Sequence, residues 1–201
     1  VVVPMHNSEK YVGRCLDSLI GQSLRDIEVI AVDGSKNNES AKIVEEYMQK
    51  DPRIHLLRYP ESTGPGPSRN KGIEAAQGEY VGFVDSDDWV SPEFYETLYN
   101  LATTSSKDGV YDIAKGEMMF VRGRDQYQYV LDVGTIKKQG VIQDVFTYQH
   151  STGLYRRGLL MEHPDARYGD ALFGEDIVFL VKVGYYAHNI TSTSSAHYYY
   201  F

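Results

Sequence analysis

Three carboxylates, Asp85, Asp87 and Asp88, crowd into four residues directly after a short apolar run over residues 80–84. Negative charges this close repel one another, so the turn is stable only when something positive lies among them. A divalent cation that also binds phosphate oxygens suits such a set, because Mg²⁺ and Mn²⁺ combine few carboxylates with substrate phosphates. A solvated acidic turn would explain the same residues, and the rest of the chain has to decide between the two.

A second pair of carboxylates, Glu175 and Asp176, stands at the start of a predicted helix over residues 175–185. The helix dipole favours acids at that place whatever their function. A carboxylate there can also act as a general base that takes the proton from an acceptor hydroxyl. Both interpretations stay open at this point.

Two cations, Arg69 and Lys71, lie near the start of a predicted helix over residues 68–77, after a Pro- and Gly-rich loop at 59–67. Together with the free N–H groups of the helix end, they could hold a diphosphate. Ordinary ion pairs are the alternative for both side chains.

Apolar periodicity in the first half of the chain predicts strands that alternate with helices. The predicted strands cover residues 1–4, 27–32, 54–57 and 80–84, and the helices between them cover 12–20, 43–50 and 68–77, with Ser8 as the first N-cap. This alternation is typical of a parallel sheet with helices on both faces. Right-handed crossovers bring the carboxyl ends of the strands to one edge, where ligands bind. We therefore expect Asn7, Asp33 and the acidic turn to gather there.

The second half is less regular. Ser91, Pro92 and Glu93 predict a helix start, with the helix running to about residue 104. Residues 111–121 and 127–133 predict strands of a small antiparallel addition, 153–157 a strand entering a short helix, 163–173 a loop, and 190–201 a strand. Residues 137–149 match neither the helical nor the strand periodicity of apolar residues.

Composition indicates one globular domain of 201 residues, with 42% hydrophobic residues and a net charge of −8 that argues against a broad nucleic-acid interface. The single cysteine, Cys15, has no internal disulfide partner and lies on an apolar helix stripe, which favours a reducing compartment. No apolar run is long enough for a membrane span. The sequence begins inside an apolar run at Val1 without Met, so we expect residues in front of it and a further segment or anchor after Phe201.

Other motif classes fit poorly. The chain has no Gly-x-Gly-x-x-Gly after a strand, no P-loop and no zinc-type spacing of His and Cys. The run from Phe83 to Asp87 superficially matches the nucleophile turn of haloacid-dehalogenase-like phosphatases. That turn normally follows the first strand, whereas this one follows the fourth and has Trp89 where Thr or Val is usual.

Taken in order, several segments resemble family 2 glycosyltransferases of the GT-A fold. They are residues 1–7 (VVVPMHN), 11–22 (YVGRCLDSLIGQ), 27–40 (IEVIAVDGSKNNES), 68–72 (SRNKG), 78–89 (GEYVGFVDSDDW) and 174–179 (GEDIVF). The resemblance covers most of the chain except residues 104–150, where such enzymes vary with their acceptor.

The resemblance implies an α/β, GT-A (Rossmann-like) fold, with a mostly parallel central sheet, helices on both faces and a small antiparallel acceptor-side addition. Residues 1–103 would form the nucleotide-sugar-binding half, and 104–201 the acceptor-binding half, of one domain. The implied activity is inverting, metal-dependent and non-processive hexosyl transfer from a nucleotide-sugar, with a UDP-sugar favoured. The acceptor would be a hydroxyl of a glycan, glycolipid or polysaccharide precursor of the cell envelope.

The resemblance also assigns the nucleotide site. Asp33 would hydrogen-bond the nucleobase, and Pro4, His6 and Asn7 would line the base pocket. Arg69 would assist on the phosphates. His6 replaces the usual Tyr, and Val-Asp-Gly-Ser at 32–35 replaces the usual Val-Asp-Asp-Gly-Ser, so the base site differs from the family pattern.

For the metal and the chemistry, the resemblance makes Asp87 a ligand of Mn²⁺ or Mg²⁺ in a DXD motif. Asp85 and Ser86 would contact the ribose or the metal shell. Asp176 would be the base that deprotonates the acceptor, with Glu175 as its neighbour or substitute. His197 is a further candidate metal ligand, and Trp89 would shape the floor of the sugar or acceptor site.

Two rival hypotheses remain beside the transferase. A nucleotide-sugar-binding module without catalysis, as part of a larger protein, would keep the pocket but not need Asp176. A phosphatase-like hydrolase would release phosphate from a phosphomonoester. The absence of the Gln-x-x-Arg-Trp signature and of membrane helices argues against a processive synthase. We expect a cytoplasmic protein that could associate peripherally with the inner face of the cell membrane.

Overall fold

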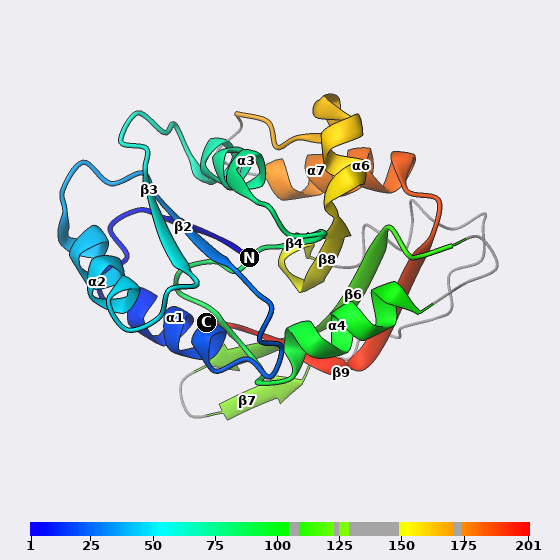
Figure 1. Cartoon of the computed structure of the whole chain (residues 1–201), viewed down its shortest axis with the longest axis horizontal. Helices are drawn as coiled ribbons and strands as arrows, with labels where there is room; N and C mark the ends of the chain where they lie inside the picture. The colour runs from blue at the N-terminus through cyan, green and yellow to red at the C-terminus, as the bar shows by residue number, and fades with distance from the viewer. Residues whose placement is uncertain (105–108, 123–124, 129–148, 171–173) are drawn as a thin grey trace.

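The computed structural model describes residues 1–104, 109–122, 125–128, 149–170 and 174–201. Within them, a parallel three-stranded sheet of order β1-β2-β3 adjoins a mixed sheet of order β4-β8-β6-β9-β5, with β7 paired to β6 (Figure 1). A parallel bridge between Val2 and Phe83 joins the two sheets.

The first half alternates strands and helices, as predicted. Its elements are β1 (Val2–Met5), α1 (Val12–Ile20), β2 (Val29–Asp33), α2 (Glu39–Met48), β3 (Ile54–Arg58), α3 (Pro65–Ala75), β4 (Tyr80–Gly82), β5 (Trp89–Val90) and α4 (Phe94–Thr103). The parallel register places Met5 opposite Asp33, so β1 and β2 end at the same edge.

The second half supplies the other strands of the mixed sheet, which β4 and β5 of the first half join. Its elements are β6 (Ile113–Arg122), β7 (Asp125–Gln128), the 3₁₀ turn η1 (His150–Thr152), β8 (Gly153–Arg156), α6 (Arg157–Glu162), the 3₁₀ turn η2 (Pro164–Ala166), α7 (Glu175–Tyr186) and β9 (Ile190–Tyr200). The predicted strand at 127–133 and the unassigned stretch at 137–149 lie largely outside the described residues.

Alternating residues of β1 face two different cores, which is the signature of a sheet covered on both sides. Val3 and Met5 pack with α1, α2 and α4, whereas Val2 packs with α3, α6 and α7. Helix α3 approaches β1 so closely that a Cβ at Gly72 would lie 2.2 Å from Val2. The predicted α/β fold class, with helices on both faces, is therefore confirmed.

Three helix starts differ from the prediction. Helix α3 begins at Pro65, inside the predicted loop, because proline suits the first turn of a helix. Helix α4 begins at Phe94, three residues after Ser91. The hydroxyl of Ser8 does not cap α1; it is hydrogen-bonded to Ser86 in the acidic turn, 2.7 Å away.

The addition to the central sheet is mixed rather than purely antiparallel. Strand β8 pairs antiparallel with β4 and β6, but β9 runs parallel to β6 through a register shift between Lys115 and Glu117. Strand β4 therefore belongs to the addition, and only Phe83 continues the parallel order.

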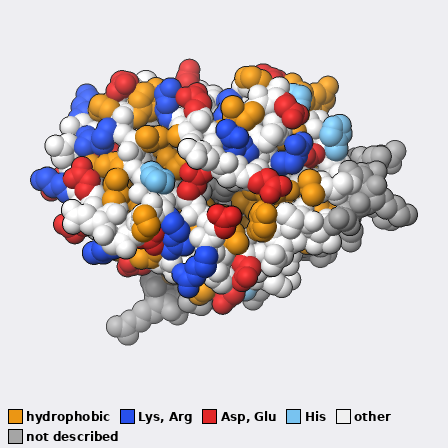
Figure 2. Space-filling model, in the orientation of Figure 1, with side chains coloured by type: hydrophobic (Ala, Val, Ile, Leu, Met, Phe, Trp, Pro, Cys, Tyr) orange, Lys and Arg blue, Asp and Glu red, His pale blue; other side chains and the backbone are white. Residues whose placement is uncertain are grey.

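None of the helices in the described part of the chain combines the length and the apolar character needed to cross a bilayer. On the face drawn in Figure 2, basic and acidic side chains are interspersed.

Candidate functional site

A pocket of about 680 Å³ lies at the carboxyl ends of β1 and β2, and we call it the carboxyl-end pocket. It is lined by Pro4, Met5, His6, Asn7, Ser8, Tyr11, Gly34, Ser62, Thr63, Gly64, Pro65, Ser68, Arg69, Asp85, Ser86, Asp87 and Tyr200. The segments after four strands, β1 to β4, thus meet at one edge, as the sheet topology predicts.

The chain turns sharply after β1, and this turn builds one wall. Asn7 has a positive φ of 52°, a conformation that Asn tolerates better than most residues. Its backbone N–H donates to Ser35 Oγ at 2.8 Å, and the Nδ1 of His6 donates to the carbonyl of Gly34 at 3.2 Å. Pro4, His6 and Asn7 therefore line the pocket together, beside the loop after β2.

Asp33 lies beneath this wall rather than in it. Its side chain is fully buried, Oδ1 accepts the backbone N–H of Ser35, and Oδ2 has no hydrogen-bond partner. The nearest cation is Arg58, whose Nε lies 3.5 Å from Oδ2. Asp33 is therefore held below the wall by Ser35 and Arg58, and it does not line the pocket.

The acidic turn forms the opposite wall, with Asp85, Ser86 and Asp87 all lining the pocket. Partial burial and the neighbouring Asp85 carboxylate raise the pKa of Asp87. Burial alone would raise the pKa of Asp85 too, but the guanidinium of Arg69 lowers it below the usual aspartate value. A divalent cation between the two carboxylates would offset both the repulsion and the desolvation, so these residues fit the predicted metal.

Asp88 has a different task. Its side chain is buried and accepts hydrogen bonds from the hydroxyl of Tyr198 and the backbone N–H of Phe201. Burial raises its pKa to about 7. Asp88 thus ties the acidic turn to the end of β9, which leaves Asp85 and Asp87 to face the pocket.

Arg69 is a buried bridge between the two predicted carboxylate sites. Its Nη2 donates to Asp85 at 2.6 Å and its Nη1 donates to Glu175 at 2.9 Å, while Nε has no hydrogen-bond partner. Its side chain is only 4% exposed. The carboxylates beside it raise the pKa of Arg69 although burial acts to lower it. By contrast, Lys71 makes an exposed ion pair with Glu74, the alternative left open for it.

Asp176 follows Glu175 at the first turn of α7, so both residues reach the same edge as the acidic turn. The Oδ2 of Asp176 lies 3.9 Å from Nδ1 of His150, and this approach lowers the pKa of Asp176. Sequence reasoning missed His150, which precedes β8 and is only 3% exposed. It has no spacing relation to the other site residues, and only the fold brings it to them.

His197 is not placed with the acidic turn. Its Nε2 donates to the carbonyl of Ser194 at 3.1 Å and lies 3.9 Å from Glu117. Across the described residues, no group of three or more His, Cys, Asp or Glu side chains is arranged to hold a metal. Trp89 also lies outside the pocket lining: its ring stacks on Tyr199, and Arg14 covers it at 3.9 Å.

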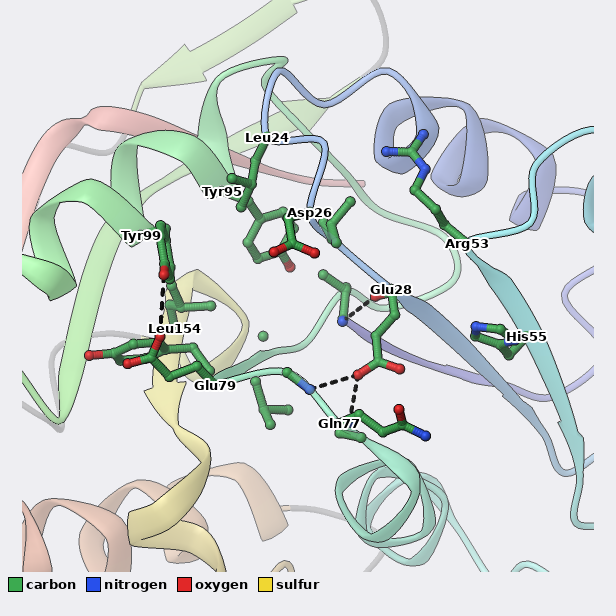
Figure 3. Close-up of a pocket in the computed structure, with 17 residues that line it drawn as sticks. Leu24, Asp26, Glu28, Arg53, His55, Gln77, Glu79, Tyr95, Tyr99 and Leu154 are labelled. Carbon is green, nitrogen blue, oxygen red and sulfur yellow. Dashed lines mark hydrogen bonds between the residues drawn. The ribbon is translucent and has the colours of Figure 1, made fainter.

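A second pocket of about 620 Å³ lies at the opposite ends of the strands, and we call it the amino-end pocket (Figure 3). Its lining includes Asp26, Glu28, Arg53, Glu79 and Tyr95. Figure 3 shows Glu28 turned toward the backbone of Gln77, where Oε1 accepts an N–H at 2.6 Å.

Comparison with known proteins gives a consistent result. A family model described as glycosyl transferase family 2 matches residues 1–164. The uncharacterized glycosyltransferase EpsJ of Bacillus subtilis is 33% identical over 190 residues, covering 89% of this chain and 52% of EpsJ. The poly(ribitol-phosphate) beta-N-acetylglucosaminyltransferase TarS of Staphylococcus aureus is 33% identical over 205 residues, covering 100% of this chain and 35% of TarS. The chain therefore spans about half or less of the length of these relatives.

Solved structures agree. The crystal structure of S. aureus TarS 1-349 in complex with UDP superimposes with a TM-score of 0.82 at 30% identity, covering 99% of this chain and 59% of that one. The same protein in complex with UDP-GlcNAc gives a TM-score of 0.82 at 28% identity, with 99% and 57% covered. The predicted GT-A fold is thereby confirmed.

Proposed function

Because the chain belongs to glycosyl transferase family 2, we propose that it moves a sugar from a nucleotide-sugar to a hydroxyl of a glycan or glycolipid acceptor, with inversion at the anomeric carbon. A UDP-sugar is the favoured donor, since the similar TarS protein was crystallised with UDP and with UDP-GlcNAc. Polysaccharide biosynthesis is the favoured context, since TarS and a poly(ribitol-phosphate) beta-glucosyltransferase are among the relatives.

The observation that carries this proposal is that two carboxylates and a buried arginine line the same pocket. Asp85 and Asp87 face it together, and Arg69 is the buried cation that joins Asp85 to Glu175, beside Asp176. A nucleoside diphosphate that arrives with a cation suits this arrangement, because each charge then gains a partner. The nucleobase would lie against Pro4 and His6, with Asp33 buried behind them and paired with Arg58.

The proposed reaction is a direct displacement. The acceptor oxygen attacks the anomeric carbon, its proton passes to a carboxylate oxygen of Asp176, and the bond to the nucleoside diphosphate breaks, with the electron pair leaving on the phosphate oxygen. Glu175 stays paired with Arg69, so we assign the base to Asp176 and a supporting role to Glu175.

Asp87 and Asp85 would hold Mn²⁺ or Mg²⁺, with Ser86 fixing the turn through its hydrogen bond to Ser8. When bound, the cation would neutralise charge on the leaving diphosphate. His197 contacts Glu117 and Ser194 instead, so we leave it out of the proposed ligand set.

The two substrates are assigned to the two halves of the chain. We assign nucleotide-sugar binding to residues 1–103 and acceptor binding to residues 104–201 of the same domain. Non-processive transfer of single hexosyl units in the cytoplasm, at the inner face of the membrane where glycolipid acceptors lie, completes the proposal.

Thermal shift measurements with UDP, GDP, CDP and dTDP, each with and without Mn²⁺, test the donor site. A ligand at a hundred times its dissociation constant stabilises the folded state by about 2.7 kcal/mol, which is readily seen as a shift in Tm. We expect the largest shift with UDP and Mn²⁺ together. No metal-enhanced shift with any of the four nucleotides would refute the proposal.

The same experiment separates the rival functions. Stabilisation by UDP without release of UDP from any UDP-sugar would favour a binding module without catalysis. Release of phosphate from p-nitrophenyl phosphate, with no response to nucleotides, would favour a hydrolase.

A further inference from the structure

We propose that His150 is a positioning residue for Asp176: its imidazole donates a hydrogen bond from Nδ1 to Oδ2 and so orients the carboxylate toward the acceptor. The inference rests on the proposed function, in which Asp176 is the base. His150 itself touches neither donor nor acceptor in this account.

The backbone around His150 is firmly held. Residues His150–Thr152 form the 3₁₀ turn η1, and the carbonyl of His150 accepts the hydroxyl proton of Tyr155 at 2.7 Å. The carbonyl of Gln149, one residue earlier, accepts from Nζ of Lys115 at 3.0 Å. The turn is thus tied to β6 and β8 of the mixed sheet.

The imidazole ring is held as firmly by aromatic neighbours. Its centroid lies 5.9 Å from the ring of Phe83 and 5.6 Å from that of Tyr168, the second contact being edge-to-face. Phe83 continues the strand that enters the acidic turn. The ring therefore has a fixed position relative to the carboxyl-end pocket, which is what a positioning group requires.

Both ring nitrogens are buried and neither has a hydrogen-bond partner in the described structure. A buried donor without a partner costs about 1–3 kcal/mol, so a ring placed only for packing would be served better by Phe or Leu. The one carboxylate paired with this ring is Asp176, whose Oδ2 stands 3.9 Å from Nδ1. That gap is about 1 Å longer than a hydrogen bond.

Asp176 has the freedom to close the gap. Its side chain is 30% exposed, and its Oδ1 accepts only the adjacent N–H of Ile177, at 2.9 Å. A small rotation brings Oδ2 onto Nδ1–H while Oδ1 stays beside the N–H of Ile177. Catalytic hydrogen bonds are often long before substrate binds and shorten in the complex.

The buried surroundings of the ring favour its neutral form. Burial and the Arg69 guanidinium lower the pKa of His150, although the carboxylates of Asp176 and Asp85 act in the opposite direction. A neutral imidazole can donate one hydrogen bond without taking the proton that belongs to the base. The hydroxyls of Tyr155 and Tyr168 complete the ionisable groups near Asp176.

Two variants of His150 separate hydrogen bonding from packing. His150→Phe keeps the ring and its aromatic contacts but has no donor, whereas His150→Asn places an amide N–H where Nδ1 stands. With UDP-GlcNAc and Mn²⁺ as the probe, and water or an added glycan as acceptor, we expect His150→Phe to lower kcat about 10- to 100-fold with the donor KM unchanged. His150→Asn should restore kcat to within about threefold of the wild type.

A double-mutant cycle tests whether His150 acts through Asp176. In an Asp176→Asn background, His150→Phe should cause no further loss, because the carboxylate that it orients is gone. An additive loss, or equal losses from His150→Phe and His150→Asn, would overturn the inference and leave a packing role.

A spectroscopic test does not depend on turnover. In ¹⁵N NMR spectra of the imidazole, we expect the Nδ1–H tautomer of His150 in the wild type and a shifted Nδ1 signal in Asp176→Asn. A protonated Nε2 with bare Nδ1, or a spectrum indifferent to Asp176→Asn, would overturn the pairing. An enzyme that neither binds UDP nor releases it would refute the proposed function instead, while the spectra would still decide on the pair.

Discussion

The two pockets have almost the same volume, about 620 Å³ and 680 Å³, yet their charges are arranged differently. In the amino-end pocket, two of the three carboxylates are hydrogen-bonded nearby: Glu28 accepts from the backbone N–H groups of Gln77 and Gly78, and Glu79 accepts from Tyr99. In the carboxyl-end pocket, Asp85 and Asp87 adjoin one another.

The groups left without partners also differ. Beside the amino-end pocket they are the Tyr95 hydroxyl, which is neutral, and one nitrogen of Arg53, whose charge is already neutralised by Asp51. Around the carboxyl-end pocket and beside Asp176 they include Nε of Arg69 and both nitrogens of His150. The volume of a pocket therefore does not identify a binding site here. Buried polar groups without a hydrogen-bond partner identify it.

The sharpest test of this comparison is a pair of carboxylate substitutions. Asp176→Asn should lower the rate of UDP release from UDP-GlcNAc by about 10²–10⁴-fold, because a general base typically accelerates a reaction by that factor. Stabilisation by UDP and Mn²⁺ should persist, because Asp176 does not line the carboxyl-end pocket. Asp26→Asn, in the amino-end pocket, is the matched control and should leave the rate unchanged. Undiminished transfer by Asp176→Asn would show that the base has been assigned wrongly.

Each pocket is also lined by an arginine, Arg69 in one and Arg53 in the other. Replacing them should lower the free energy of unfolding by different amounts. Arg69→Met removes the cation between Asp85 and Glu175 and leaves two carboxylates without it, which should cost about 3–5 kcal/mol of unfolding free energy. Arg53→Met breaks a more exposed pair with Asp51 and should cost about 1 kcal/mol or less. Urea unfolding measures both.

Arg69→Lys is the control for charge alone. Lysine keeps the charge but lacks the planar fork that reaches two carboxylates at once, so its cost should fall between the wild type and Arg69→Met. Equal costs for the Arg69→Met and Arg53→Met variants would remove the distinction between the two pockets.

Much of the fold could be predicted from the sequence because local patterns encode it. The alternation of strands and helices, with Asn7, Asp33 and the acidic turn each after a strand, is enough to bring those residues to one edge. The pattern could not show that β4 pairs with β8, since an apolar strand reads the same in a parallel and an antiparallel setting.

The parts of the site that escaped prediction depend on contacts between residues distant in the sequence. Arg69 was predicted as a phosphate ligand, but its partners lie 16 and 106 residues away and hold both ends of its guanidinium. Asp88 was left unassigned, and its partner Tyr198 lies 110 residues away. His150 carries no local signal at all. Such pairings follow from how the two sheets meet, which periodicity does not encode.

A smaller effect is expected from the acidic turn. Asp87→Asn should weaken the Mn²⁺-dependent part of UDP binding at least about tenfold, since even residues that only support a metal ligand are worth that much. The stabilisation by UDP without metal should change little. Glu79→Gln, in the amino-end pocket, is the control and should leave both quantities as they are. An Asp87→Asn variant that keeps its full response to Mn²⁺ would move the metal away from this turn.

The smallest effect should appear in the pH dependence of folding. Burial lowers the pKa of His150 below its value of 6.5 in the unfolded chain. Between the two pKa values the unfolded state binds more protons, so stability falls as the pH drops from 6.5 through the folded pKa. His150→Phe removes this contribution. Urea unfolding at about pH 7.5 and about pH 5 should show the wild type losing more stability than the variant. Equal losses would mean that His150 is already solvated in the folded protein, and that Asp176 lacks the buried imidazole proposed to position it.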